Sequence, residues 1–179
     1  VFSTICVVAL ICLFAPMAAY KLSRTQTKQS KLIFFVLILP ALVPFQSYMT
    51  MLIRLMAQTN LVATRMGYII VMDGTAIPGA VLMIHGFVKG IPVELEECAY
   101  LDGASNFRTY FAVVLPLLSP IIVTVLVLNT LGTWNDFFVN MLIMGGREET
   151  LNISNALYAK FSMQSSDWEH ALPGLVMAM

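Results

Sequence analysis

The sequence predicts an all-α protein that crosses a membrane several times. Of its 179 residues, 59% are hydrophobic and only 11% are charged, whereas roughly a quarter of the residues in an average soluble domain are charged. The apolar residues gather in long uncharged runs, which suit membrane-spanning helices. Ten basic residues balance ten acidic ones, so no net positive field exists to hold nucleic acid. The composition therefore excludes an ordinary soluble globule and a disordered chain.

Four apolar runs are long enough to span a bilayer, which needs about 20 residues of helix. They cover residues 1–20, 32–53, 66–88 and 109–135. Pro40 and Pro44 are expected to kink the second run, and prolines are tolerated in membrane helices because neighbours satisfy the freed backbone groups. The third run carries one acid, Asp73. The next apolar run, 137–146, is too short to cross again. We therefore predict a helix bundle with four complete spans and part of a fifth.

Both ends of the sequence lie within apolar runs. Val1 has no basic segment before it, and residues 171–179 would form about 13 Å of helix, too short for a hydrocarbon core of about 30 Å. We interpret residues 1–179 as one transmembrane domain that is truncated at both ends.

Basic residues predict the orientation, because positively charged loops stay on the cytoplasmic side. The first loop contains four of them and no acid: Lys21, Arg24, Lys28 and Lys31. Alternation then places residues 54–65 outside, 90–110 in the cytoplasm and 147–168 outside again.

Catalytic and metal-binding patterns are missing from the sequence. The cysteines and histidines are too scattered for zinc, haem or a disulfide framework: Cys6, Cys12, Cys98, His85 and His170. No paired acids or nucleophile-base pair converge in the sequence. We predict a non-enzymatic protein with no catalytic residues, no metal site and no bound cofactor.

The second cytoplasmic loop departs from ordinary membrane hydropathy. Four acids fall within nine positions: Glu94, Glu96, Glu97 and Asp102. Pro92 suits the first position of a helix, the glutamates complement its dipole, and Gly103 suits the position just past its end. A helix of about eleven residues is predicted, with Glu94 and Glu96 solvated.

Ser105 is a good N-cap for a second helix that continues into the fourth span, bent early by Pro116 and Pro120. On charge pattern alone, an acidic helix between two spans is most often a solvated connection.

The order and spacing of residues in and after this loop are more informative about function than its charge. The positions concerned are Glu97, Cys98, Ala99, Gly103, Val113, Leu115 and Pro116. Their spacing resembles the Glu-Ala-Ala, Gly, Ile, Leu-Pro pattern of permease subunits of binding-protein-dependent ABC importers. Cys98 replaces the first alanine and Val113 replaces the isoleucine.

The resemblance implies that residues 90–110 form a coupling helix that docks in a cleft of a cytoplasmic ATPase subunit. The implied coupling residues are Glu97 for a charged contact, Cys98 and Ala99 for close packing, Asp102 and Gly103 for the turn, and Leu115 and Pro116 for the Leu-Pro end. A short rigid element that continues into a span could transmit a rigid-body movement into the membrane.

Other segments resemble the carbohydrate branch, in particular the second membrane subunit of maltose and multiple-sugar importers. They are Ala19-Tyr20 with Arg24, residues 91–97, residues 133–137, and Asp167-Trp168 with Ala171. The resemblance implies a multi-pass permease in a bacterial cytoplasmic membrane that moves a sugar by alternating access. Its implied partners are an ATPase dimer, a second homologous permease and an extracytoplasmic solute-binding protein. Because the sequence has no Gly-rich phosphate loop, ATP and Mg²⁺ are assigned to the ATPase.

Polar side chains within or beside the spans are the candidates for a sugar path. They are Gln46, Ser47, Thr50, Asn129, Trp134, Asn135 and Asp136. Helix-to-helix hydrogen bonding is the alternative role for the amides and hydroxyls, and an interfacial position is the alternative for the tryptophan. Asn155, Tyr158 and Gln164 of the outer loop are candidate contacts for the binding protein.

Two alternative functions remain open at this point. A permease for another solute would share the coupling pattern, and the segment 134–137 is what separates it from a sugar permease. An ion-coupled secondary transporter would instead carry acids in the middle of its spans. Here most acids lie in the cytoplasmic loop and near span ends.

Overall fold

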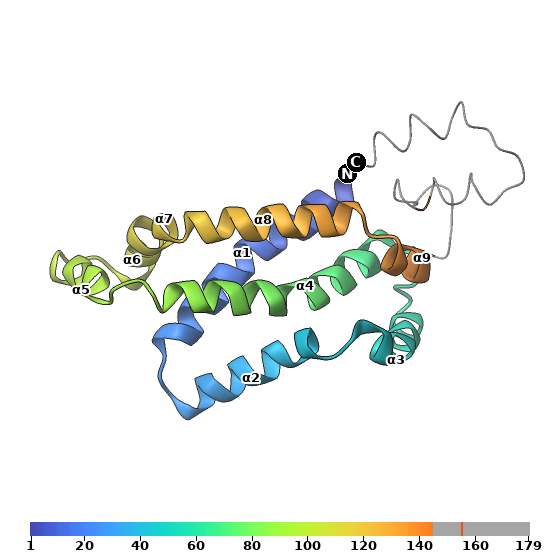
Figure 1. Ribbon diagram of the computed structural model, residues 1–179, viewed down its shortest axis with the longest axis horizontal. Helices are drawn as coiled ribbons and strands as arrows, with labels where there is room; N and C mark the ends of the chain where they lie inside the picture. The colour runs from blue at the N-terminus through green and yellow to red at the C-terminus, as the bar shows by residue number, and fades with distance from the viewer. Residues whose placement is uncertain (145–154, 156–179) are drawn as a thin grey trace, which may run out of the picture. The chain divides into compact units, whose positions relative to one another are not determined.

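The computed structural model describes residues 1–144 and 155, and all regular secondary structure in this part of the chain is helical (Figure 1). This confirms the all-α prediction. The chain divides into two compact units. The first contains Val1–Val8, Pro44–Gly74 and the described residues from 129 onward, and the second contains Ala9–Val43 and Thr75–Leu128.

Two of the predicted spans are long, apolar helices. Helix α1 covers Phe2–Arg24 and helix α4 covers Arg65–Val88, and both are long and apolar enough to cross a membrane. Pro16 and Pro78 lie inside these helices. The first and third apolar runs therefore form helices much as predicted.

The second predicted span is not one kinked helix but two helices. Helix α2 covers Lys28–Leu42 and helix α3 covers Phe45–Gln58. Pro44 disfavours helical backbone at the preceding residue, and Val43 is accordingly extended at φ −97° and ψ 128°. Pro40, in contrast, lies within α2. The prediction of a single helix was wrong because Pro44 ends the helix rather than bending it.

The fourth predicted span is bent by 70° near its start. Its first part consists of α6 (Asn106–Thr109), the π-helical turn η1 (Tyr110–Val114) and α7 (Leu115–Leu117), and its second part is α8 (Ser119–Trp134). Proline and π-turns are common causes of helix bends, and both occur here. The predicted early bend is therefore confirmed. Four crossings result if each broken pair of helices crosses as one span.

The second unit is built around small and branched side chains. Ile11, Ala15 and Ala19 repeat every four residues on one face of α1, and all three are fully buried. Fully buried residues elsewhere in this unit include Val81, Ile84, Val88, Val114 and Leu118. This packing fixes the end of α1 within the unit that also contains the predicted coupling loop.

The first unit contains α3, the start of α4, and α9 (Phe138–Met144). The backbone N–H of Ala63 donates to the carbonyl of Ile143 at 2.7 Å. The rings of Phe45 and Phe138 meet edge to face at 6.0 Å between centroids. Helix α9 occupies the short apolar run that the sequence assigned to an incomplete fifth span.

Candidate functional site

Helix α5 is the predicted coupling helix, and it covers Glu94–Leu101. Its eight residues are fewer than the predicted eleven, because Pro92 lies before the helix and Asp102 and Gly103 form its end. Three glutamates lie in its first turn, where they complement the helix dipole as predicted.

Gly103 ends α5 in the left-handed conformation, with φ +80°. Its N–H donates to the carbonyl of Tyr100 at 3.0 Å, and the N–H of Ala104 donates to the carbonyl of Ala99 at 2.9 Å. This pair of bonds is the Schellman arrangement that satisfies the last carbonyls of a helix. Ser105 then caps α6, since its hydroxyl oxygen accepts the N–H of Arg108 at 3.4 Å. The predicted turn between the two helices is confirmed.

Replacing Gly103 with valine is expected to lower the stability of the full-length protein by about 1–2 kcal/mol, because a branched residue is strained in left-handed backbone. A side chain here would meet no atom within 4 Å, so the cost is backbone strain alone. Gly103→Asn is the control, since asparagine tolerates this conformation. Thermal denaturation in detergent measures both, and equal stability of the valine and asparagine variants would contradict the account.

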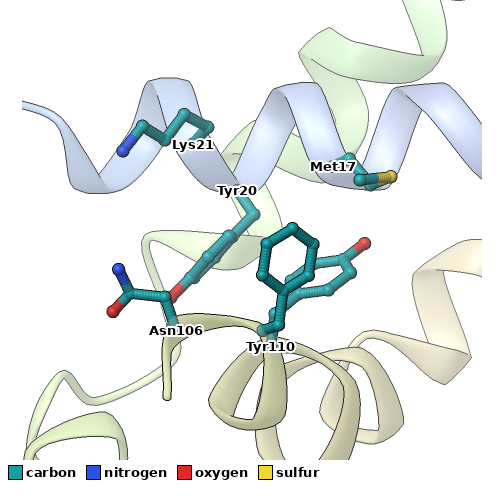
Figure 2. Close-up of a pocket in the computed structure, with 6 residues that line it drawn as sticks. Met17, Tyr20, Lys21, Asn106 and Tyr110 are labelled. Carbon is teal, nitrogen blue, oxygen red and sulfur yellow. The ribbon is translucent and has the colours of Figure 1, made fainter.

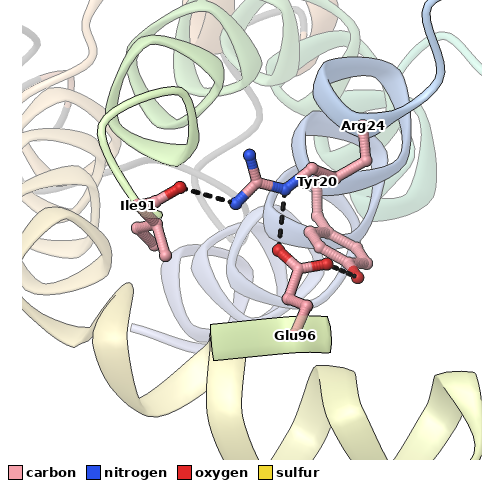
Figure 3. Close-up of polar contacts among 4 residues, drawn as sticks. All are labelled: Tyr20, Arg24, Ile91 and Glu96. Atoms are coloured by element: carbon pink, nitrogen blue, oxygen red, sulfur yellow. Dashed lines mark hydrogen bonds and ion pairs between the residues drawn. The ribbon is translucent and has the colours of Figure 1, made fainter. Parts of the chain in front are cut away.

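Glu96 is buried, with only 4% of its surface exposed, so the prediction that it is solvated was wrong. One carboxylate oxygen accepts the Tyr20 hydroxyl at 2.7 Å, and the other pairs with Arg24 Nε at 2.7 Å. Arg24 also donates through Nη2 to the carbonyl of Ile91 at 2.9 Å. Figure 3 shows both side chains of α1 converging on this carboxylate. Burial is tolerated because the charge is paired and hydrogen-bonded.

These contacts attach α5 to the C-terminal end of α1. Tyr20 and Arg24 are four residues apart, so they lie on one face of α1 and reach the same carboxylate. Sequence reasoning used Arg24 only for orientation and as part of a family motif. The four-residue spacing is the signal that could have suggested a shared partner.

The exposed surface of α5 carries the residues expected to meet an ATPase. Glu97 and Cys98 are exposed, and Ala99 is half-buried. A cavity of about 200 Å³ lies beside them, lined by Ala99, Asp102, Ala104, Arg108, Ala112 and Val113. It brings two motif positions together, Ala99 of α5 and Val113 of η1. Leu115 is half-buried and Pro116 is exposed in α7, one turn further along.

A second cavity, of about 340 Å³, is lined in part by Tyr20 (Figure 2). Tyr20 and Tyr110 face each other across 5.2 Å between ring centroids. The remaining lining residues are Met17, Lys21, Asn106 and Phe107. Tyr20 therefore joins α1 to both α5 and η1.

All seven candidates for the sugar path belong to the first unit. Gln46, Ser47 and Thr50 lie exposed in the first half of α3. Asn129 and Trp134 are half-buried in α8, and the exposed Asn135 and the half-buried Asp136 follow that helix. The two predicted sites thus fall in different units: the coupling loop in the second and the path candidates in the first.

Asp136 holds the start of α9. Its carboxylate accepts the N–H groups of Val139 at 3.2 Å and Asn140 at 2.9 Å, and the hydroxyl of Tyr68 at 3.2 Å. Burial raises the pKa of the Asp136 carboxyl above its ordinary value, and these three hydrogen bonds oppose that rise. Asp136, a candidate for the sugar path, therefore caps α9 in this structure.

Of the predicted binding-protein contacts, only Asn155 lies in the described part of the chain. It is 4% exposed, and its amide nitrogen donates to Asn140 Oδ1 at 2.6 Å. Tyr158 and Gln164 lie outside the described residues, as does most of the predicted outer loop 147–168. Among residues 1–144 and 155, no group of three His, Cys, Asp or Glu side chains could hold a metal ion.

Comparison with solved structures supports the fold. A bacterial ABC transporter involved in the import of the acidic polysaccharide alginate has a chain that matches with a TM-score of 0.77 and 23% identity, over 98% of this chain and 61% of that one. At this identity the match shows the fold.

Three similar curated proteins are named as permeases for sugars or starch degradation products. A probable starch degradation products transport system permease of Thermoanaerobacterium thermosulfurigenes is 31% identical over 98% of this chain and 64% of its own length. A multiple sugar-binding transport system permease of Streptococcus mutans is 35% identical over 79% of this chain and 52% of its own length. A melibiose/raffinose/stachyose import permease of Bacillus subtilis is 32% identical over 82% of this chain and 54% of its own length.

The chain thus spans between about half and two thirds of the length of these relatives. Residues 11–179 match the family described as the binding-protein-dependent transport system inner membrane component. That match covers most of the chain and agrees with the helical fold, the apolar helices and the motif-bearing loop. The chain belongs to this family of inner membrane transport components.

Proposed function

We propose that the full-length protein is a permease subunit of an ATP-driven importer that moves a carbohydrate across the cytoplasmic membrane by alternating access. The observation that carries this proposal is the coupling loop, in which a capped helix with an exposed Glu97-Cys98 surface is anchored through the buried Glu96. The family match and the names of three relatives support it.

The proposed coupling begins where α5 docks on the ATPase. Glu97 supplies a charged contact, while Cys98 and Ala99 allow close approach because their side chains are small. The Gly103 turn and the Ser105 cap connect α5 to α6 and onward to α8. The contacts of Glu96 with Tyr20 and Arg24 provide a second connection, to α1. A movement of α5 would then reach two membrane helices together.

The proposed substrate is a sugar because the relatives are named for starch products, multiple sugars and raffinose-type oligosaccharides. The polar residues of α3 and the end of α8 are proposed to line its path, since sugars need hydrogen-bonding partners. The proposed partners are an ATPase dimer that uses ATP and Mg²⁺, a second homologous permease and an extracytoplasmic binding protein.

Cys98 offers a direct test, because it is exposed whereas Cys6 and Cys12 are half-buried in α1. In full-length protein that retains only this cysteine, a membrane-impermeant maleimide is expected to react only from the cytoplasmic side. Binding of the cognate ATPase is expected to reduce the labelling rate by about tenfold or more, because docking covers α5. Vesicles of both orientations, with and without ATPase, provide the measurement.

A cysteine placed at Thr59 is the matched control, since this residue is exposed at the end of α3. It should react from the opposite side and gain no protection from the ATPase. Labelling of Cys98 from outside would reverse the topology. Cytoplasmic labelling that no cognate ATPase reduces would contradict the docking role and favour an ion-coupled transporter.

A further inference from the structure

A basic cavity lies within the second unit, where the end of α1, the start of α2 and the end of α4 meet. It measures about 230 Å³. Its polar lining residues are Ser23, Thr25, Gln26, Lys31, His85 and Lys89. Cavities for drug-sized ligands typically measure about 300–1,000 Å³, so this one suits a smaller group. Nothing in the proposed transport mechanism uses it.

The charge of the cavity is uncompensated. Lys31 and Lys89 come from different parts of the chain, and the lining includes no carboxylate. Within the described residues, neither lysine takes part in an ion pair. Two ammonium groups at one cavity without an acid repel each other, and a bound anion would relieve that repulsion.

Buried polar groups add directional partners to this charge. Ser23 is 5% exposed, and its hydroxyl oxygen has no hydrogen-bond partner among the described residues. His85 is 8% exposed and stacks on Phe34 with 4.0 Å between ring centroids. A buried hydroxyl without a partner is uncommon in proteins and calls for an explanation such as a bound ion or water. An anion oxygen in the cavity would accept the Ser23 hydroxyl.

We propose that this cavity binds a phosphate group, supplied either by an anionic phospholipid or by free phosphate. Phosphate offers several acceptor oxygens and a negative charge, which match two lysines and a hydroxyl. Basic pockets between membrane helices on the cytoplasmic side are a known setting for anionic headgroups. The basic segment that includes Lys31 thus does two things in this proposal. It keeps its loop on the cytoplasmic side, and it contributes a lysine to the phosphate site.

The surface beside the cavity favours the lipid as the source. Immediately after Lys31, α2 exposes large apolar side chains: Leu32, Ile33, Phe35 and Val36 are each more than half exposed. Acyl chains could lie along this part of α2 while the headgroup entered the cavity. Free phosphate would use the lysines and Ser23 but not this apolar surface.

The test uses full-length protein and two double variants with the same change in charge. Lys31→Gln/Lys89→Gln alters the cavity, and Lys21→Gln/Lys28→Gln removes two exposed lysines of the same basic loop that do not line it. Each protein is reconstituted in phosphatidylcholine nanodiscs with increasing phosphatidylglycerol, and bound lipid is counted by native mass spectrometry. A parallel titration in phosphate-free detergent uses inorganic phosphate and follows thermal stabilisation.

The cavity variant is expected to bind phosphatidylglycerol about thirtyfold more weakly than the wild type, at roughly 1 kcal/mol for each hydrogen bond that a lysine donates to the phosphate, while the control variant loses far less because its lysines do not line the cavity. Ser23→Ala should also weaken binding, although it changes no charge. Stabilisation by inorganic phosphate that only the cavity variants lose would support free phosphate as the ligand. Equal loss in both double variants would show diffuse attraction and overturn the proposal. Wild-type protein that binds neither probe would also overturn it.

Discussion

Replacing Glu96 with alanine is expected to destabilise the protein by about 3 kcal/mol and to reduce uptake. Removal of one partner of a buried ion pair leaves the other unpaired, which costs roughly 3–5 kcal/mol. Arg24 is partly exposed, with 21% of its side chain accessible, so the lower end of that range applies. The Tyr20 hydroxyl loses its acceptor as well. Thermal denaturation of the full-length protein in detergent measures the stability, and sugar uptake in vesicles measures the coupling.

Glu94→Ala is the matched control, because Glu94 lies in the same helical turn but is exposed. It should change stability by less than about 0.5 kcal/mol, as surface substitutions usually do. The double exchange Arg24→Glu/Glu96→Arg should recover part of the uptake that either single reversal loses. Equal thermal stability of the Glu96 and Glu94 variants would contradict the claim that Glu96 stabilises the contact between α5 and α1.

Glu97→Lys is expected to abolish uptake while the protein inserts and denatures much as the wild type does. Glu97 is exposed, so its reversal breaks no described internal contact, but it reverses the charge that this residue is proposed to present to the ATPase. A reversed interface charge costs several kcal/mol of docking free energy. Uptake and ATPase binding in proteoliposomes, measured beside thermal denaturation, would separate lost docking from lost folding.

Glu94→Lys controls for the unfavourable effect of a positive charge at the helix start, which is about 0.3–1 kcal/mol at such sites. It should retain a large part of the uptake. Normal uptake by the Glu97 variant would refute the docking role of this residue. If both variants lost uptake equally, the negative charge of the whole helix start, rather than Glu97, would direct the docking.

The long helices could be predicted because they depend on properties that the local sequence contains. A run of about 20 apolar residues has few alternatives to a membrane helix, and this was sufficient for α1 and α4. The breaks were harder to predict, because each proline has a different effect. Pro16, Pro40 and Pro78 lie inside helices, whereas Pro44 separates two helices. The difference depends on whether the surroundings satisfy the freed carbonyl, which the local sequence does not specify.

The candidate site shows the same division. The Gly103 turn and the Ser105 cap were predictable, because both involve backbone groups only a few residues away. The contact between Arg24 and Glu96 joins residues 72 positions apart, and three glutamates within four positions gave no indication of which one is buried. The basic cavity was hidden for the same reason, since Lys31 and Lys89 become neighbours only when α2 and α4 pack.

The π-helical turn Tyr110–Val114 lets the helix that follows α6 adopt a second register. A π-turn holds one residue more than an α-turn, and each residue of an α-helix corresponds to about 100° of rotation and 1.5 Å of rise. Conversion of this turn to regular α-helix would therefore rotate the residues that follow by about 100° about the helix axis. A small shift of α5 along its axis could in this way become a rotation of the helix that α6 leads into.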